Sequence, residues 1–361
     1  MHKKLTIEIG ASKSWSIIIG DGILGKFGEF IDFKLYSAIV LMTDTATGKL
    51  YGQQVKEALE ATRKRVIVFT VPVGEDSKSL EEAERVYRFL MNNNVGRKAL
   101  LCVLGGGVVG DLGGYIAATY LRGIDYIQLP TTLLAQVDSS IGGKVGVNFG
   151  EKKNIIGSFY QPRAIVSDVT LLQSLPAEEM RNGTAEVIKY GLAMDKELFQ
   201  RLSDRGKGEF TPSELVDIVE RCSILKTEIV KADETERSGQ RAILNFGHTV
   251  GHAVEASVGS WGQHHGEAVA IGMVAAAKIS EQMGMLNSKS VDEIDNILTR
   301  FGLPARCRGM TPDKLLGAMK FDKKATDGQV KWVLLEEIGH GVVNCTVGED
   351  IVREVLREMC Q

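Results

Sequence analysis

Residues 100–111 read LLCVLGGGVVGD, and this stretch decides the fold. A short apolar segment runs directly into three glycines, and helix-like sequence with the acidic residue Asp111 follows. Glycines let the backbone approach an anion, and a helix start presents free N–H groups and the positive end of the helix dipole. The stretch therefore predicts a strand, a phosphate-binding loop and a helix. It is neither a G-x-G-x-x-G fingerprint nor a P-loop, so a tight strand-to-helix connection is the alternative for this segment alone.

The same alternation continues on both sides of this stretch through the first half of the chain. Short apolar segments bounded by turn or polar residues predict strands at 5–9, 15–19, 37–42, 65–71, 100–104, 126–129 and 164–166. Segments 48–63 and 79–93, which lie between strands, have helical periodicity. Strands that alternate with helices in this way are typical of a parallel sheet covered by helices.

The pattern changes from about residue 175 onward. Helical periodicity dominates at 212–232, 247–258 and 268–283, and the next strand is expected only at 331–335. A chain of 361 residues also favours two domains of roughly 100–200 residues each. We predict an α/β plus all-α protein, with a parallel-sheet domain at residues 1–172 and a helical domain at 173–361.

Composition excludes several classes of protein. A net charge of -3 excludes a globally basic nucleic-acid binder. The most apolar stretch, 268–277, is shorter than the roughly 20 residues that span a membrane, and no apolar signal segment is seen near the N-terminus. The five cysteines are scattered without a C-x-x-C pair, which favours reduced thiols and a cytoplasmic location.

Two further loops follow predicted strands. Asp44 comes after the strand at 37–42, and the segment GEDSK, residues 74–78, comes after the strand at 65–71. Ligands of open α/β sheets bind outside the carboxyl ends of the strands. Together with the glycine loop, these segments predict a dinucleotide site.

Several cations lie among glycines and apolar residues rather than on charged surface helices. They are Arg122, Lys144 and Lys153. For any one lysine a solvated surface position is the more common role. As a group near a nucleotide loop, they indicate an anionic substrate.

A histidine cluster indicates a metal. Four of the six histidines lie within residues 248–265, and His248 and His252 are spaced i, i+4 on one face of a predicted helix. Histidines close to a carboxylate suit zinc with one position open for substrate. Spacing alone nominates both His248 and His252, with an acidic ligand from elsewhere. Glu186 lies in the mostly apolar helical segment AEVIKYG, where a charge is costly without a partner. A packing role for the H-x-x-x-H pair is the alternative.

These segments together resemble the 3-dehydroquinate synthase family of sugar phosphate cyclases. The motifs GGGVVGDLGGYIAATYLRG, LPTTLLAQVDSSIGGKVGVN, KKNIIGSFYQP, AEVIKYG, RAILNFGHTVGHAVE and HHGEAVAIGM run from Gly105 to Met273 in the family's order. The resemblance implies a Rossmann-like NAD domain followed by a helical metal-binding domain, with the active site in the cleft between them. It also implies a cytoplasmic homodimer that acts on a small phosphorylated sugar acid.

The resemblance assigns residues by matching motif positions. It implies a zinc or cobalt ion bound by Glu186, His248 and His265. His252 becomes an active-site residue instead of a ligand, and His264 stands where the family usually has an apolar residue. The implied NAD contacts are Asp44, Glu75, Lys78, Gly106, Gly107, Asp111, Thr131, Thr132 and Asp138, with Lys144 and Lys153 bordering both ligands. The implied substrate contacts are Arg122, Lys144, Lys153, Asn154, Lys189, Lys226, Arg241, Asn245, His252 and Lys323.

The implied reaction converts 3-deoxy-D-arabino-heptulosonate 7-phosphate to 3-dehydroquinate and phosphate, with NAD oxidising the substrate transiently. Three alternatives stay open at this point. A related cyclase of the 2-deoxy-scyllo-inosose synthase type would share the cofactor sites. A metal-dependent polyol dehydrogenase would produce net NADH. A nucleotide- or metal-binding regulatory protein would have no turnover.

Overall fold

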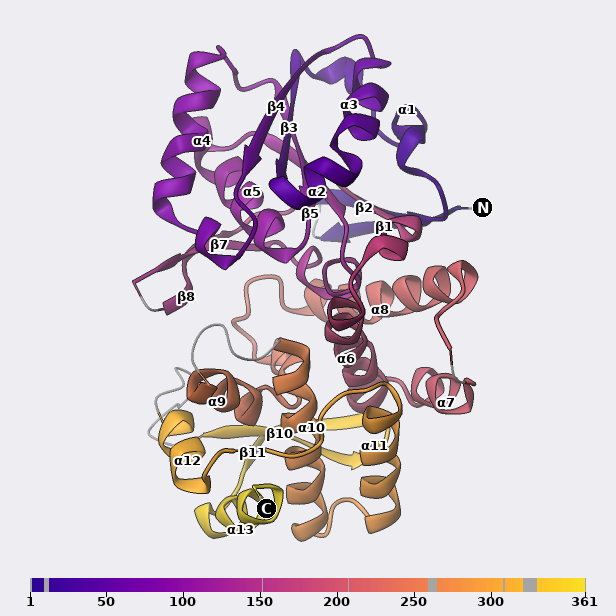
Figure 1. Ribbon diagram of the computed structural model, residues 1–361, viewed down its shortest axis with the longest axis vertical. Helices are drawn as coiled ribbons and strands as arrows, with labels where there is room; N and C mark the ends of the chain where they lie inside the picture. The colour runs from indigo at the N-terminus through magenta and orange to yellow at the C-terminus, as the bar shows by residue number, and fades with distance from the viewer. Residues whose placement is uncertain are drawn as a thin grey trace. The chain divides into compact units, whose positions relative to one another are not determined.

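The computed structural model describes residues 2–9, 13–150, 152–206, 208–258, 265–307, 309–320 and 330–360. The chain divides into two compact units. One unit comprises Met1–Leu175 and Phe210–Thr235, and the other comprises Pro176–Glu209 and Glu236–Gln361. Figure 1 follows the chain by colour from the N-terminus to the C-terminus.

A parallel-dominated sheet forms the base of the first unit. Within the described residues it has seven strands in the order β1-β2-β9-β6-β5-β3-β4, and only β1 and β2 pair antiparallel. The strands are β1 His2–Ile9, β2 Lys13–Gly20, β3 Ala38–Asp44, β4 Arg65–Val71, β5 Ala99–Gly105, β6 Asp125–Pro130 and β9 Ala164–Asp168. Each strand predicted for the first half of the chain is confirmed, with ends that differ by a few residues.

Both faces of the central strands β3, β5, β6 and β9 are buried, which explains their continuous apolar runs, whereas the edge strands β1 and β4 are partly exposed. Val40 and Met42 of β3 belong to one apolar cluster, and Ile39 and Leu41 belong to another. Residues of α4 and α5 complete the first cluster, and residues of α3 complete the second. The helices of this unit are α1 Phe27–Phe30, α2 Thr45–Thr47, α3 Gln53–Glu60, α4 Leu80–Asn92, α5 Gly107–Thr119 and α8 Pro212–Ala232. Figure 1 shows α3 and α4 on opposite sides of the sheet.

Two features of the first unit differ from the sequence expectation. An antiparallel hairpin of β7 Lys144–Phe149 and β8 Lys152–Phe159 lies outside the main sheet and was not predicted. Helix α8 belongs to the first unit, whereas the boundary at 172/173 assigned it to the second domain. It packs against β1 and β2, and Lys3 of β1 forms ion pairs with Asp217 and Glu220 of α8.

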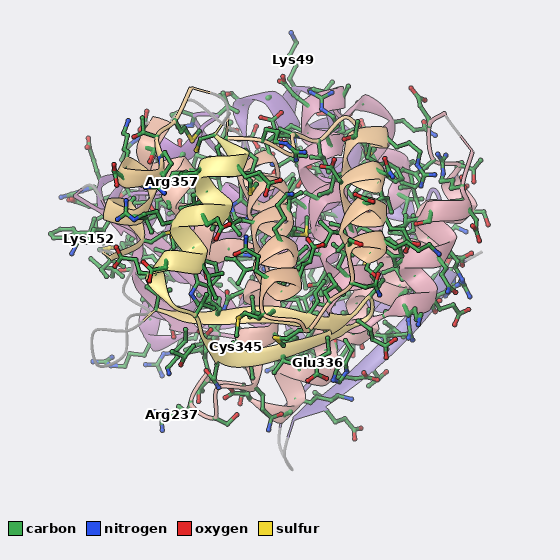
Figure 2. All side chains as sticks on the ribbon, turned by 90° about the horizontal axis from the view of Figure 1, so that it is seen from below. Lys49, Lys152, Arg237, Glu336, Cys345 and Arg357 are labelled. Atoms are coloured by element: carbon green, nitrogen blue, oxygen red, sulfur yellow. The ribbon has the colours of Figure 1, made fainter. Side chains whose placement is uncertain are left out.

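The second unit is helical with one small hairpin. Its helices are α6 Ala177–Met194, α7 Lys196–Asp204, α9 His248–Val258, α10 His265–Gln282, α11 Ser288–Arg300, α12 Pro312–Lys320 and α13 Glu349–Met359. The predicted strand near residue 331 is confirmed as β10 Lys331–Glu337, which pairs with β11 His340–Thr346. Figure 2 shows Glu336 and Cys345 on this hairpin and Arg357 on α13. Helix α10 is central, since it packs against α6, α9, α11, α13 and β10.

Among the described residues, no helix is both long enough and apolar enough to cross a bilayer.

Candidate active site

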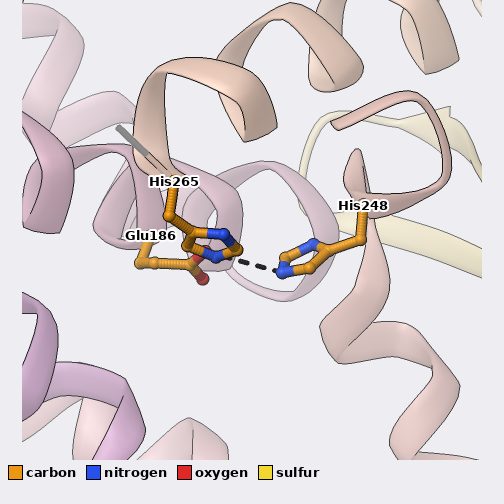
Figure 3. A group of neighbouring side chains, drawn as sticks. All are labelled: Glu186, His248 and His265. Atoms are coloured by element: carbon orange, nitrogen blue, oxygen red, sulfur yellow. Dashed lines mark ion pairs between the residues drawn. The ribbon is translucent and has the colours of Figure 1, made fainter. Parts of the chain in front are cut away.

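Three side chains of the second unit converge on a common point. Glu186 comes from the middle of α6, and His248 and His265 are the first residues of α9 and α10. The Glu186 Oε1 atom lies 3.7 Å from His248 Nε2 and 3.5 Å from His265 Nε2. Figure 3 shows both rings beside the Glu186 carboxylate. Two ligands of a tetrahedral zinc ion, each about 2.0–2.1 Å from the metal, lie about 3.3 Å apart. The spacing therefore fits one divalent ion.

A close contact between helices brings the two histidines together. A Cβ atom added to Gly272 of α10 would lie 1.8 Å from the Gly247 carbonyl oxygen, so no larger residue fits there. Gly247 itself has φ +78°, a conformation that side chains disfavour, and helix α9 begins at the next residue. The predicted helix began one residue earlier. The two glycines hold the first turn of α9 against α10.

The Glu186 carboxylate is buried in a way that calls for a cation. Its side chain is 1% exposed, so its ionised form depends on nearby positive charge. Lys189, one turn along α6, forms an ion pair with Oε2 and donates a hydrogen bond to the Leu244 carbonyl oxygen at 2.7 Å. Burial opposes ionisation of Glu186, but Lys189 and the two histidines lower its pKa well below its usual range. An ionised carboxylate that faces two imidazoles suits a metal ion.

The two histidines are prepared differently. Burial lowers the pKa of His248 well below its usual range, so its ring is neutral. Its Nδ1 atom lies 3.2 Å from the Phe246 carbonyl oxygen, which leaves the Nε2 lone pair for a ligand. Burial also acts against protonation of His265, but Glu186 and Glu255 raise its pKa to about 10. A metal ion would have to displace that proton.

His252 lies near this group but outside it. Its ring centroid is 5.4 Å from that of His248, as expected for i, i+4 positions on one helix face. Among the described residues, the set whose ligand atoms converge contains Glu186, His248 and His265. The nomination of His252 as a ligand from spacing alone was therefore wrong. The i, i+4 rule shows that two residues share one helix face, and it does not show that their ligand atoms meet at one point.

The glycine loop lies where the topology favours a ligand. Strand β5 is followed by α5 on one face of the sheet, and its neighbour β3 is followed by α3 on the other. Ligands of open α/β sheets bind at such a switch point. Gly106 is the N-cap of α5, and an added Cβ on it would lie 3.1 Å from the Thr132 side chain. The Thr131 N–H donates to the Gly105 carbonyl oxygen at 3.0 Å, so both predicted threonines border the loop.

Two other predicted NAD residues pair with each other, and a third caps a helix. Lys78 forms a buried ion pair with Asp111 of α5. Burial raises the pKa of Asp111, and Lys78 opposes that effect. Asp44 caps the helix after β3, where it accepts hydrogen bonds from the N–H groups of Ala46 and Thr47 at 2.8 Å. The structure thus gives Asp44 a structural task that the sequence did not reveal.

Asn148 of β7 is a connecting residue that the sequence did not single out. Its Nδ2 atom donates to Glu75 Oε1 at 2.8 Å, and its Oδ1 atom accepts from the Asn154 N–H at 2.9 Å. Its own N–H donates to the Lys78 carbonyl oxygen at 2.8 Å. Asn148 therefore links the loop that follows β4 to the β7–β8 hairpin. Only its position in the motif GVN could have pointed to it.

Two exposed predicted residues of the first unit have positive φ angles. Arg122 has φ +68° in the 3-10 turn Tyr120–Arg122, and Asn154 has φ +56° in β8. Non-glycine residues at positive φ store strain and concentrate at functional sites. Lys144 and Lys153 project from the hairpin and are exposed to solvent. Lys226 of α8 is instead largely buried, and it donates to Asp138 O and Oδ1 at 2.7 Å.

The remaining predicted residues lie in the second unit or outside the description. Arg241 is 2% exposed in the 3-10 segment Gln240–Asn245, and Asn245 at its end is partly exposed. Lys323 and His264 lie outside the described residues.

Comparisons with known proteins place this geometry in a family. The model for the N-terminal part of 3-dehydroquinate synthase matches residues 68–182, and the model for its C-terminal part matches residues 183–325. The 3-dehydroquinate synthase of Dehalococcoides mccartyi is 40% identical over 352 residues, which cover 97% of this chain and 98% of the relative. That of Nitrosospira multiformis is 42% identical over 354 residues, which cover 98% and 96%.

The chain belongs to the 3-dehydroquinate synthase family. Membership of this family makes it an enzyme. The expectation drawn from the motifs is confirmed at the level of the family.

Solved structures of sugar phosphate cyclases share the fold of this family member. A 2-deoxy-scyllo-inosose synthase complexed with carbaglucose-6-phosphate, NAD+ and Co2+ superposes with a TM-score of 0.89 at 24% identity, covering 99% of this chain and 100% of that one. The 2-epi-5-epi-valiolone synthase of Streptomyces hygroscopicus subsp. jinggangensis, with NAD+ and Zn2+ bound, gives 0.88 at 26% identity and covers 98% of both chains. The predicted combination of a Rossmann-like unit and a helical unit is confirmed.

Proposed function

We propose that this protein converts 3-deoxy-D-arabino-heptulosonate 7-phosphate to 3-dehydroquinate and phosphate, as an NAD-dependent and metal-dependent enzyme of the shikimate pathway. The observation that carries the proposal is the group of Glu186, His248 and His265 in a chain that is at least 40% identical over its length to named 3-dehydroquinate synthases. Related cyclases of known structure bind NAD+ with Co2+ or Zn2+, which supports both cofactors here.

The residues of the second unit would hold the metal and the reacting hydroxyls. Glu186, His248 and His265 would be the metal ligands, with Lys189 balancing the second oxygen of the carboxylate. His252, next to His248 on the same helix face, would accept and return the proton of the hydroxyl that is oxidised. When bound, the metal supplies Lewis acidity at the substrate hydroxyls, and NAD supplies a transient oxidation that acidifies the neighbouring C–H for loss of phosphate.

Cationic and amide side chains would bind the substrate's charged ends. We assign the phosphate to Lys153, Asn154, Lys189 and Arg241, and the carboxylate and remaining hydroxyls to Arg122, Lys144, Lys226, Asn245 and Lys323. Several cations that hold one pose allow consecutive steps without release of intermediates. Arginine suits such a role because its planar guanidinium binds carboxylate or phosphate through two parallel hydrogen bonds.

The dinucleotide would bind at the carboxyl ends of the strands in the first unit. The proposed contacts are Asp44, Glu75, Lys78, Gly106, Gly107, Asp111, Thr131, Thr132, Asp138, Lys144 and Lys153. The N-terminus of α5 after the glycines suits the pyrophosphate, because its N–H groups are free of side-chain caps. We further propose that the protein is a homodimer and that it is cytoplasmic. The free cysteines of the described chain support the cytoplasmic location.

One assay tests the reaction. The purified protein is incubated with the heptulosonate phosphate and NAD+, and phosphate, NADH and dehydroquinate are followed together. We expect equal amounts of phosphate and dehydroquinate with no net NADH. Net NADH without phosphate release would instead identify a polyol dehydrogenase, and phosphate release with another carbocycle would identify a different sugar phosphate cyclase.

A second assay tests the cofactor. Removal of the metal with a chelator should abolish turnover, and addition of zinc or cobalt should restore it. Full activity in a demonstrably metal-free sample would refute the metal requirement.

A further inference from the structure

A carboxylate that no motif singled out contacts one of the proposed metal ligands. Glu255 lies on α9, seven residues after His248, and its Oε1 atom is 3.3 Å from His265 Nδ1. The opposite ring nitrogen of His265, Nε2, is 3.5 Å from Glu186 Oε1. The His265 ring therefore lies between two carboxylates, with one nitrogen facing each.

We propose that Glu255 is a positioning residue that orients His265 and fixes its tautomer for metal binding. A neutral imidazole carries one N–H, and a metal needs the lone pair of the other nitrogen. If Nδ1–H donates to Glu255, Nε2 presents its lone pair to the side of the ring where Glu186 lies. A carboxylate behind a metal-bound histidine also raises the basicity of the ring. The inference rests on the metal centre of the proposed function.

The two histidines differ in how they are supported. His248 faces the Phe246 carbonyl oxygen at 3.2 Å, an acceptor that belongs to the backbone and is present whatever the side chain. His265 faces a side chain, and Glu255 contributes from a different helix than the one that carries His265. A single substitution at Glu255 can therefore remove the support for the orientation of His265 while all three proposed metal ligands stay in place.

Glu255 acts from behind the ring rather than as a ligand itself. Among the described residues, the set with convergent ligand atoms contains Glu186, His248 and His265 and does not include Glu255. The Glu255 side chain is 23% exposed, so water reaches its pair with His265. Removal of the Glu255 carboxylate therefore leaves no deeply buried charge behind. A positioning role predicts weaker metal binding, whereas a purely structural ion pair predicts only a less stable fold.

The experiment measures metal affinity without turnover. Metal-free full-length protein is titrated with Zn2+ in competition with a chromophoric chelator, for the wild type, Glu255→Ala, Glu255→Gln and Glu354→Ala. Glu354 is an exposed residue of α13 and serves as the matched control. We expect the affinity of Glu255→Ala to fall by about 10- to 100-fold, as is typical when the partner of a metal-bound histidine is lost. Glu255→Gln, whose amide oxygen still accepts a hydrogen bond, should lose less, and Glu354→Ala should match the wild type.

Two additional readouts separate positioning from folding. The visible spectrum of the Co2+-loaded protein should change in Glu255→Ala, because the spectrum reports ligand geometry. The thermal unfolding midpoint of the metal-free protein should fall only slightly in both Glu255 variants, because the ion pair that they lose is partly exposed. Wild-type affinity and an unchanged cobalt spectrum in Glu255→Ala would overturn the inference, even if the metal-free protein unfolded at a lower temperature.

One further variant distinguishes this failure from failure of the proposed function. Glu186→Gln should lose zinc binding far more completely than either Glu255 variant. If Glu186→Gln binds zinc as tightly as the wild type, the metal centre itself is refuted, and with it the inference. If Glu186→Gln loses binding while Glu255→Ala keeps it, only the role of Glu255 is refuted.

Discussion

The proposed metal group of the second unit, which consists of Glu186, His248 and His265, differs from the β7–β8 hairpin of the first unit in how it would receive a ligand. Glu186 is 1% exposed and its neighbours His248, His265 and Lys189 are already arranged around it. On the hairpin, Lys153 and Asn154 are exposed, and Asn154 has a positive φ of 56°. A buried carboxylate must be neutralised by its surroundings before any ligand arrives, whereas surface cations stay solvated at little cost until an anion binds.

Because Glu186 is buried, removal of its charge should affect both metal binding and the stability of the fold. Glu186→Gln should abolish metal binding and activity, and it should also destabilise the fold. Loss of one partner of a buried ion pair costs about 3–5 kcal/mol, because the Lys189 ammonium would be left uncompensated. Metal analysis, turnover and urea unfolding measure the three effects. Glu197→Gln, at an exposed position on α7, is the control and should change none of them.

On the exposed side, the effect should fall on substrate binding alone. Arg122→Ala should raise the KM for the heptulosonate phosphate about 10- to 100-fold, since a hydrogen bond to a charged group contributes about 1.5–3 kcal/mol. Arg63→Ala is a matched control, because Arg63 also has positive φ, at 59°, in another surface turn. An unaltered KM in Arg122→Ala would exclude this residue from the substrate site.

Helix packing around the metal group should tolerate little added volume. A Cβ on Gly266 would lie 2.3 Å from the Asn182 carbonyl oxygen, and the Gly266 N–H donates to Asn182 Oδ1 at 2.6 Å. Gly266→Ala should therefore destabilise the protein by about 1–3 kcal/mol in urea unfolding. Gly317→Ala on α12, where nothing lies within 4 Å of the added atom, should be neutral or stabilising by about 0.5–1 kcal/mol. Equal stabilities of the two variants would contradict the close contact.

The smallest effect is expected where the hairpin joins the loop after β4. Asn148→Ala removes one donor to Glu75 and one acceptor for Asn154. The bond to Asn154 is neutral and contributes about 0.5–1.5 kcal/mol, and the bond to the Glu75 carboxylate contributes about 1.5–3 kcal/mol. Because Asn148 would act on both ligands only through these neighbours, NAD affinity should fall and substrate KM should rise by about 3- to 10-fold each. NADH fluorescence titration and steady-state kinetics measure them. Asn92→Ala, exposed at the end of α4, should leave both unchanged. An effect on only one ligand would show that Asn148 does not link the two segments.

The sequence predicted the sheet because burial on both faces leaves a signal in every residue. In SAIVLM every residue after Ser37 is apolar, as is all of LLCVL, and Ile39 to Met42 lie alternately in the two apolar clusters. The hairpin leaves no such signal, since β8 is exposed over most of its length. The placement of α8 could not be derived either, because helical periodicity reports which face is buried and not which partner covers it.

The same limit applies to the candidate site. Motif resemblance supplied Glu186, His248 and His265, whereas local spacing supplied His252 in place of His265. The three side chains meet because α6, α9 and α10 pack together, and residue spacing along one helix cannot predict how separate helices pack. Glu255 and Asn148 went unnoticed because a glutamate on a helix and an asparagine in a strand are common, and only their partners make them distinctive.

The contact between Gly272 and the Gly247 carbonyl has a consequence for the choice of ion. The separation of α9 and α10 at this point is set by the absence of side chains, so the distance between the two imidazoles is inherited from helix packing. In the proposed metal site, the spacing of these two ligands would therefore be set by residues that do not contact the ion. A library for changing metal preference should vary this helix interface while keeping every ligand.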